Sequence, residues 1–368
     1  MTDEELKYAI ALTQIPGVGD VIAKSLISYC GGVEQVFKKK KSHLLKVPGV
    51  GPLIADAVAS FADFSAAEKE VQFIHKHKIQ PIFFTEENYS QALKQVADSP
   101  ILLFFKGNCN LNEGKFISIV GTRHATDYGK EWTEKFVEEI SVYNPVIVSG
   151  LAFGIDIAAH KAALKHDLKT IAVLGHALNT IYPGQHRGTA EKMVEQGGLL
   201  TEFSTADDFI KENFPERNRI VAGMCEAIIV VESGAKGGAL ITAEIAASYN
   251  KDVFAVPGRV SDNFSKGCNY LIKQNKAAML ESAEDFIAMM NWKTDEVKSE
   301  KVKQREILFD LEPNEQTVVD VLKQKENVHV DELMHTASLT SSQFAATLLN
   351  LELKGVIKVM PGKMYRLN

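Results

Sequence analysis

The sequence predicts an α/β protein built on a Rossmann-like, doubly wound and mostly parallel sheet, with a smaller helical domain before it and another after it. Two observations favour this fold class. Residues 113–290 alternate short apolar runs with helical stretches, as doubly wound sheets do. Glycine-rich segments follow nearly every apolar run, which is where such a sheet presents its ligand loops.

Composition indicates an ordinary globular protein of two to three domains: 368 residues, 45% hydrophobic and 24% charged. Long apolar runs are missing and the first residues are acidic, so we expect a cytoplasmic protein with no membrane partner. A net charge of −6 confines any nucleic-acid site to a local patch. Widely spaced cysteines predict reduced, buried thiols and no metal site; they are Cys30, Cys109, Cys225 and Cys268.

Residues 1–65 contain an internal repeat, in which a Pro-Gly-Val-Gly turn precedes a run with helical periodicity. The turns contain Gly17 with Gly19 and Gly49 with Gly51, 32 residues apart. Such glycines let the backbone pass close to a phosphate, while the next helix offers its N-terminal amides. The segment resembles the helix-hairpin-helix motif, so these four glycines are possible DNA contacts. Its seven lysines are matched by seven acidic residues, and a protein-docking or spacer role is the alternative.

A connector at 66–112 is expected to contain helices at 66–77 and 88–97 and strands at 81–84 and 102–106. We expect these strands to extend the sheet that follows, so that residues 66–290 form one Rossmann-like domain. The later strands are expected at 116–120, 146–149, 170–174, 198–201, 227–231 and 252–256. The helices between them are expected at 129–142, 154–164, 189–196, 217–224 and 238–249.

Charged residues at 291–306 predict a linker, and residues 307–368 predict a further domain. Its expected elements are helices at 314–323, 330–336 and 341–354, then strands at 356–359 and 364–367 around a Pro361-Gly362 turn. That order predicts a winged helix. From residue 311 on, six basic residues face seven acidic ones, which favours a protein contact or a regulatory role over duplex recognition.

Aromatic and cationic residues gather in the segment 203–220 without a catalytic pair. Phe214 precedes Pro215, which predicts an extended backbone that presents the ring outward for base stacking. Lys211, Arg217 and Arg219 can neutralise phosphates beside it. For the two arginines the alternative is structural pairing with acids such as Glu202 or Glu232.

Two glycine-rich loops complete the candidate site. Gly121, Thr122 and Arg123 follow the apolar run 116–120, so Arg123 is expected at the ligand crevice of the sheet. Gly237 and Gly238 follow the run 227–231 and are expected at the same edge. The combined chemistry predicts a site for a polyanion.

Other chemistries are weakly indicated. The first loop lacks the later glycines of G-x-G-x-x-G, a Gly-Lys-Ser/Thr loop is missing, and Ser233 lacks the first glycine of a nucleophile elbow. Asp156 and His160 lie four residues apart on one helix face, where a structural role is favoured over acid-base catalysis. We therefore expect no catalytic residue and no cofactor.

The central domain resembles the DNA-processing protein A (DprA, also called Smf) family. The resemblance is carried by Gly121-Thr122-Arg123, Ser149-Gly150, Gly154-Ile155-Asp156, Ala159-His160, Tyr182-Pro183, Phe214-Pro215, Arg217-Asn218-Arg219-Ile220, Gly238, Leu240, Thr242-Ala243, Val256-Pro257-Gly258 and Gly267 with Asn269. It implies a single-stranded-DNA-binding homodimer that loads the RecA recombinase during natural transformation. By motif, Gly121, Thr122 and Arg123 would grip phosphate, Lys211 would contact the backbone, and Phe214 a base. Residues 175–179 depart from the Gly-x-Gly-x-Asp that the family usually has there.

An enzyme is the competing interpretation. Lys236, Gly237 and Gly238, with Thr242 and Glu244, are similar to the loop of nucleotide phosphoribohydrolases, in which a glutamate acts on the ribose. The Pro-Gly-Gly opening of that loop is missing here, and Glu244 also suits the first turn of a helix. The apolar helix at 238–249 is a candidate dimer surface.

Overall fold

A computed structural model describes residues 1–292, 311–323, 328–337, 339–360 and 363–367. The chain forms two compact units, Met1–Thr294 and Asp295–Asn368. From residue 293 on, the expected linker lies outside the described residues, and so does the expected turn at 361–362. No helix in the described part of the chain is both long and apolar enough to span a bilayer.

Within residues 1–292, nine strands form one sheet in the order β1-β2-β6-β5-β4-β3-β7-β8-β9. Their bounds are β1 Gln80–Phe83, β2 Leu102–Gly107, β3 Phe116–Val120, β4 Val146–Ser149, β5 Thr170–Val173, β6 Gly197–Thr201, β7 Ala227–Val230, β8 Asp252–Ala255 and β9 Ala278–Met279. The β1–β2 and β2–β6 pairs are antiparallel and the other pairs are parallel. The predicted fold class is confirmed, and the connector strands extend the sheet as expected.

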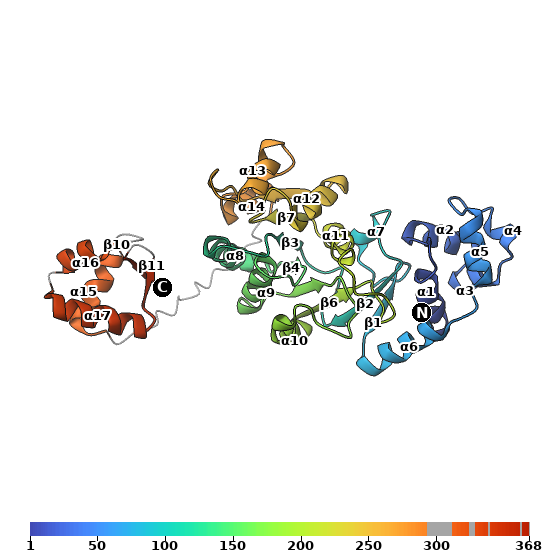
Figure 1. Ribbon diagram of the computed structural model, residues 1–368, viewed down its shortest axis with the longest axis horizontal. Helices are drawn as coiled ribbons and strands as arrows, with labels where there is room; N and C mark the ends of the chain where they lie inside the picture. The colour runs from blue at the N-terminus through green and yellow to red at the C-terminus, as the bar shows by residue number, and fades with distance from the viewer. Residues whose placement is uncertain (293–310, 324–327, 338, 361–362, 368) are drawn as a thin grey trace. The chain divides into compact units, whose positions relative to one another are not determined.

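Helices cover both faces of this sheet because its strands are apolar on both sides. Ile117 and Ile119 of β3 belong to the core under one face, whereas Phe116 and Val120 belong to the core under the other. Figure 1 shows α9 and α10 on one side of the strands and α11 and α12 on the other. The bounds of the core helices are α7 Gln91–Lys94, α8 Asp127–Ile140, α9 Ile155–Lys165, α10 Arg187–Glu195, α11 Asn213–Met224, α12 Gly238–Ser248, α13 Lys266–Lys273 and α14 Ala283–Met289.

The strand order reverses direction between β3 and β7. From β3 the chain adds β4, β5 and β6 on one side, and from β7 it adds β8 and β9 on the other. At such a switch point the loops after the two central strands separate and leave a crevice outside their carboxyl ends. The loops that begin at Gly121 and at Val231 therefore flank the natural ligand position of this sheet.

The N-terminal region consists of α1 Asp3–Thr13, α2 Asp20–Cys30, α3 Val33–Lys38, α4 Lys41–Leu44, α5 Pro52–Ser60 and α6 Ser65–His77. The two hairpin turns of the repeat have the same backbone geometry. Gly17 and Gly49 both have φ of +83°, which favours glycine, and Gly19 and Gly51 are the extended N-cap residues of α2 and α5. The predicted helix-hairpin-helix region is confirmed.

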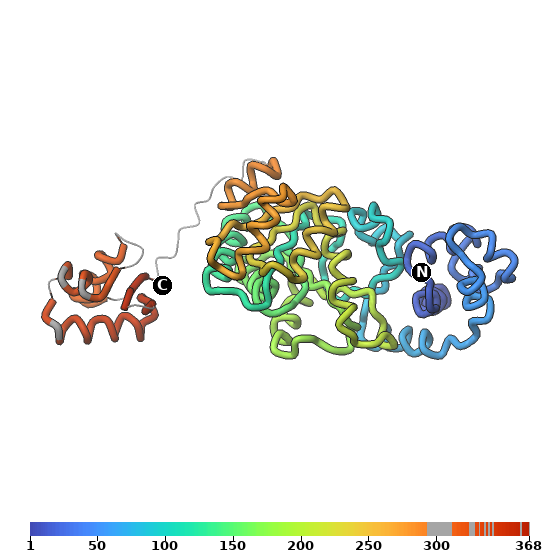
Figure 2. Tube along the Cα trace, turned by 45° about the horizontal axis from the view of Figure 1, so that its top comes forward, coloured from blue at the N-terminus to red at the C-terminus, as the bar shows by residue number. Residues whose placement is uncertain are grey.

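These N-terminal helices share a hydrophobic core with the antiparallel edge of the sheet. Leu12 and Leu26 of the repeat belong to the same buried cluster as Phe83 of β1 and Phe104 of β2. Figure 2 shows the blue helical region beside the cyan segment that contains these strands. The first 65 residues therefore bury their apolar face against the Rossmann-like core, although the boundary at residue 65 stays a prediction.

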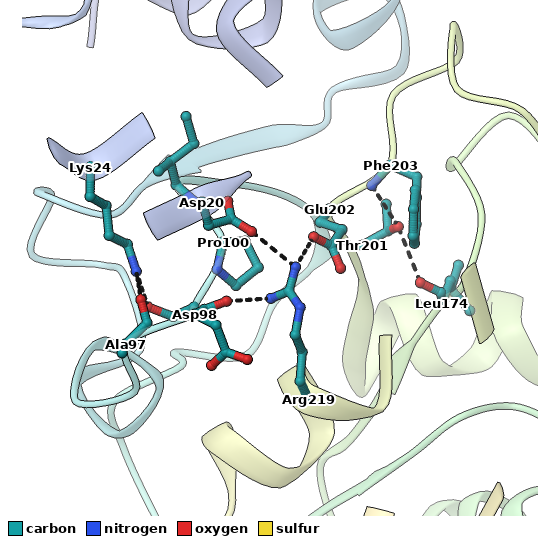
Figure 3. A network of polar contacts seen from close by, with 12 residues as sticks. Asp20, Lys24, Ala97, Asp98, Pro100, Leu174, Thr201, Glu202, Phe203 and Arg219 are labelled. Atoms are coloured by element: carbon teal, nitrogen blue, oxygen red, sulfur yellow. Dashed lines mark hydrogen bonds and ion pairs between the residues drawn. The ribbon is translucent and has the colours of Figure 1, made fainter. Parts of the chain in front are cut away.

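Arg219 of α11 joins the repeat to the core through charge. Its guanidinium pairs with Asp20 of α2 at 3.1 Å, with Glu202 after β6, and donates to the carbonyl oxygen of Asp98 at 2.9 Å. Lys24 donates to the neighbouring Ala97 carbonyl oxygen (Figure 3). It also donates to the Ser99 hydroxyl. Burial raises the pKa of Glu202, and the guanidinium opposes that shift. The structural alternative for Arg219, a pair with Glu202, is confirmed.

The second unit contains the helices α15 Pro313–Leu322, α16 Val330–Ala337 and α17 Ser341–Leu353, and the strands β10 Val328–His329, β11 Ile357–Met360 and β12 Met364–Leu367. The strands form a sheet in the order β10-β12-β11. Val318, Leu333, Phe344 and Leu351 contribute to its core. This arrangement confirms the predicted winged helix and adds β10, which is too short to give a periodic signal.

Some predicted bounds were wrong. The helix expected at 88–97 is reduced to α7, because the Ser90 hydroxyl caps it by accepting from the Leu93 amide and the chain turns after Lys94. The helix expected at 217–224 begins earlier, at Asn213. The elements α13, β9 and α14 were not predicted.

Substituting Arg219→Met tests the charged network between the repeat and the core. Asp20 and Glu202 would then face each other without their shared cation, so we expect the free energy of unfolding to fall by about 3 kcal/mol. Urea denaturation measures this loss. The control Lys276→Met breaks the exposed pair with Glu244 and should cost less than about 1 kcal/mol. Equal losses for the two variants would contradict a structural role for Arg219.

Candidate nucleic-acid interface

A cleft of about 780 Å³ opens at the switch point of the sheet. Val120 at the end of β3, the residues 121–124 after it and most of the segment 233–238 after β7 line it, as the topology requires. Gly150 after β4, Tyr182 and most of the segment from Phe209 to Asn218 form further parts of its wall. The cleft thus lies between the carboxyl ends of several strands and the first turn of α11.

The loop after β3 is held in place by its backbone. The Thr122 amide donates to the Glu232 carbonyl oxygen at 2.7 Å, and the Thr122 hydroxyl accepts from the His124 amide at 3.2 Å. A Cβ at Gly121 would overlap Ile155, and Gly154 has φ of +79° where it passes the Thr122 carbonyl. Arg123 at the tip is exposed, and its guanidinium carbon lies 6.0 Å from the centre of the Phe214 ring.

Glu232 fixes the other end of this loop. Its carboxylate accepts from the Thr126 amide at 2.9 Å and from the Thr126 hydroxyl at 2.5 Å, at the N-cap of α8. A Cβ at Gly129 would meet the same carboxylate. Glu232 is therefore a structural anchor of the loop and forms no ion pair with Arg217 or Arg219 among the contacts of the described residues.

The predicted extended backbone at Phe214 was wrong. Phe214 and Pro215 lie in the first turn of α11, where the amide that proline lacks would have had no intrahelical partner. The Phe214 ring is half-buried, beside Tyr182 with 5.8 Å between ring centres and beside Phe209 with 5.8 Å. It still lines the cleft, so the helix rather than an extended strand presents it.

Arg217 lines the cleft, although it is only 5% exposed. Its guanidinium donates to the Val173 carbonyl and to the Gly150 carbonyl oxygen at 3.1 Å. Burial lowers the Arg217 pKa to about 10, and the Asp156 carboxylate opposes that shift, so the side chain stays charged at neutral pH. These contacts favour the structural alternative for Arg217: it ties the loop after β4 to the end of β5.

Asp156 and His160 occupy structural positions. The Asp156 carboxylate accepts from the Gly150 amide at 3.1 Å and the Ala152 amide at 3.4 Å. His160 is fully buried, with Nδ1 2.7 Å from the Thr170 hydroxyl, which itself donates to the Ile147 carbonyl. Because the Thr170 hydroxyl already donates its proton, Nδ1 of His160 is protonated and donates to the Thr170 hydroxyl oxygen. Burial lowers the pKa of His160 to about 3 and keeps the ring neutral.

The remaining predicted residues divide between the cleft and other surfaces. Lys211, Gly237 and Gly238 line the cleft, and Lys211 is exposed. The hairpin glycines lie elsewhere: Gly17 and Gly19 line a separate hollow, and the positions at Gly49 and Gly51 open onto free space. That the four hairpin glycines contact DNA stays a prediction.

Glu244, the residue required by the enzyme interpretation, is not part of the cleft lining. Its carboxylate pairs with Lys276 at 2.9 Å. Within the described residues no group of three or more His, Cys, Asp or Glu side chains could hold a metal ion. All four cysteines are buried and free, as predicted.

Sequence reasoning missed Phe209 and Ile210 and did not assign Tyr182 to the cleft wall. Phe209 is 52% exposed and Tyr182 is 47% exposed, although both are large aromatic residues. Their ring centres lie 5.3 Å apart. Two adjacent apolar residues in an otherwise polar loop, directly before Lys211, were the available signal.

Comparison with known proteins identifies the family. A family model described as DNA recombination-mediator protein A matches residues 80–291. The chain belongs to this family. A helix-hairpin-helix motif matches residues 8–71, and a DprA winged helix domain matches residues 303–363.

Similar proteins come from several bacteria. Protein Smf of Synechocystis sp. is 30% identical over 401 residues, which cover 100% of each chain. DNA processing protein DprA of Streptococcus pneumoniae is 39% identical over 55% of this chain and 71% of its own. The X-ray structure of the S. pneumoniae protein has a TM-score of 0.67 and 32% identity over 77% of this chain and 97% of that one. The Helicobacter pylori protein, solved to describe its single-stranded DNA binding mode, has a TM-score of 0.53 and 29% identity over 58% and 96% of the two chains.

Substituting His160→Asn tests the buried neutral ring. Asparagine can still donate to Thr170 but cannot take up a proton. Because the unfolded histidine binds a proton near pH 6.5 and the folded one only near pH 3, the wild type should lose stability as the pH falls below about 6.5. Relative to His160→Asn, we expect an additional slope of up to about 1.4 kcal/mol per pH unit. Urea unfolding at pH 7, 6 and 5 measures it, and parallel curves would refute the assignment.

Proposed function

We propose that this protein is a non-catalytic, single-stranded-DNA-binding recombination mediator, and that the cleft at the switch point holds the strand. The observation that carries the proposal is the placement of exposed Arg123 beside the Phe214 ring, at 6.0 Å. A guanidinium can bind a phosphate bidentately, while an adjacent ring can stack on the base of the same nucleotide.

The rest of the cleft suits the same ligand. Lys211 and Lys236 add positive charge along the wall, and the backbone at Gly237 and Gly238 is free of side chains that would keep a phosphate away. The Arg217 and Glu232 contacts hold the loops in place before a ligand arrives, which reduces the ordering cost of binding.

Family membership supports the wider role. The matching family is described as a recombination mediator, and the H. pylori relative was solved for its single-stranded DNA binding mode. We further propose that the protein acts in the cytoplasm as a homodimer and delivers DNA to RecA during natural transformation or recombination, as the family resemblance implies. Residues 66–290 would bind the strand, and the two flanking domains at 1–65 and 307–368 would serve further contacts.

The direct test compares a labelled oligo-dT with a duplex of the same length by fluorescence anisotropy. We expect tighter binding of the single strand. Equal affinity for both, or absent binding of the single strand, would overturn the proposal.

The salt dependence of binding tests the assigned phosphate contacts. Each of Arg123→Ala and Lys211→Ala should lower the slope of log affinity against log salt concentration by about 0.7, the value for one phosphate of a single strand. The control Lys192→Ala removes an exposed lysine on α10, outside the cleft, and should leave the slope unchanged. An equal effect of all three variants would indicate a diffuse charge effect instead of a defined site.

A further inference from the structure

A second hollow of about 340 Å³ lies on the other side of an aromatic wall from the cleft. Tyr182 and Phe209 form this wall, since both residues line both spaces. Its other lining includes His176, Asn179 and Thr180 from the loop after β5 and Asp208 beside Phe209. This loop contains the segment 175–179, in which the chain departs from the usual family pattern.

The rings are arranged as a continuous partition. Phe209 meets Phe214 edge to face at 85° and Tyr182 at 72°, and it lies 5.7 Å from the His176 ring. Rings in such contact keep their orientation, yet Phe209 and Tyr182 remain about half exposed. A half-exposed aromatic wall between two hollows offers a surface on which planar ligands can stack.

The segment that carries Phe209 is held at both ends. The Asp207 carboxylate accepts from the Ser204 amide at 2.5 Å and from its hydroxyl at 2.9 Å, and the Thr205 amide donates to Glu70 at 2.9 Å. On the other side the Asn213 side chain donates to the Asp208 carbonyl at 2.8 Å. The wall is therefore built into the fold of the free protein.

The chemistry of the second hollow differs from that of the cleft. Asp208 is exposed, and no lysine or arginine is part of the lining. A carboxylate repels phosphate but accepts from the amino group of a base, as acidic residues do with the N4 amine of cytosine. Asn179 and Thr180 add further groups that can bind a base edge.

We propose that this hollow is a second nucleobase site, which takes the base next to the one stacked on Phe214, with the Phe209–Tyr182 wall between the two bases. Asp208 is the acceptor for the exocyclic amine, so cytosine or adenine is preferred there over thymine. The proposal rests on the proposed function, because the same strand occupies the cleft.

Phe209→Ala and a matched control test the wall. With a six-nucleotide oligo-dC, Phe209→Ala should bind about 10-fold more weakly than the wild type, the range expected for one lost stacking contact, with an unchanged salt slope. The control Tyr29→Ala removes an exposed aromatic residue of α2 that lines neither space, and it should bind as the wild type does. Wild-type affinity of Phe209→Ala would overturn the second site.

A tryptophan variant provides a second test of the wall that does not depend on the folding of Phe209→Ala. Oligo-dC should quench the indole fluorescence of Phe209→Trp by stacking on the new ring. This quenching should exceed any quenching of Trp132 and Trp292 that the wild type shows. Unquenched Phe209→Trp in a protein that binds the oligonucleotide would overturn the proposal.

Asp208→Asn tests the base preference. The wild type should bind six-nucleotide oligo-dC about 5-fold more tightly than oligo-dT, and Asp208→Asn should lose most of that preference while both oligonucleotides still bind. A preference unchanged by Asp208→Asn would overturn the assignment of Asp208. If the wild type binds neither oligonucleotide, the proposed function itself fails, whereas failure of the second site alone leaves the Arg123 salt effect intact.

Discussion

The buried guanidinium of Arg217 is the interaction on which the candidate site depends. It binds carbonyl oxygens at the end of β5 and in the loop after β4, while Asp156 holds amides of that same loop. A charge buried this deeply is tolerated only when its hydrogen bonds are complete. These contacts hold the base of the crevice, above which exposed Arg123 lies beside the half-buried ring of Phe214.

The helix α11 connects the base of the crevice to the rest of the first unit. Phe214 and Arg217 lie three residues apart, so they share the face that looks toward the cleft. Arg219 leaves the helix in another direction and pairs with Asp20 of the N-terminal repeat. One short helix therefore places the Phe214 ring in the wall of the cleft, binds two strand ends and holds the helical repeat.

Sequence periodicity was sufficient to predict the strands of the sheet, but it did not predict which residues form the walls of the cleft. Strands such as Phe116–Val120 and Val146–Ser149 are buried on both faces, so their apolar runs have sharp ends that glycines mark. The start of α11 was misjudged because the local preference before Pro215 is overridden in the first turn of a helix. Phe209 was missed because a loop has no period, and the buried partners of Arg217 come from strands that only the folded chain brings together.

The shared core between the N-terminal repeat and the antiparallel edge of the sheet limits where this protein can be divided to build chimeras. Phe83 and Phe104 belong to strands of the central domain, yet their side chains pack among the helices of the repeat. A chimera that exchanges only the first 65 residues would set a foreign helical surface against these rings and leave Arg219 without Asp20. An N-terminal piece transplanted from this chain should therefore end after β2, so that it contains both the helical region and the two strands that pack against it.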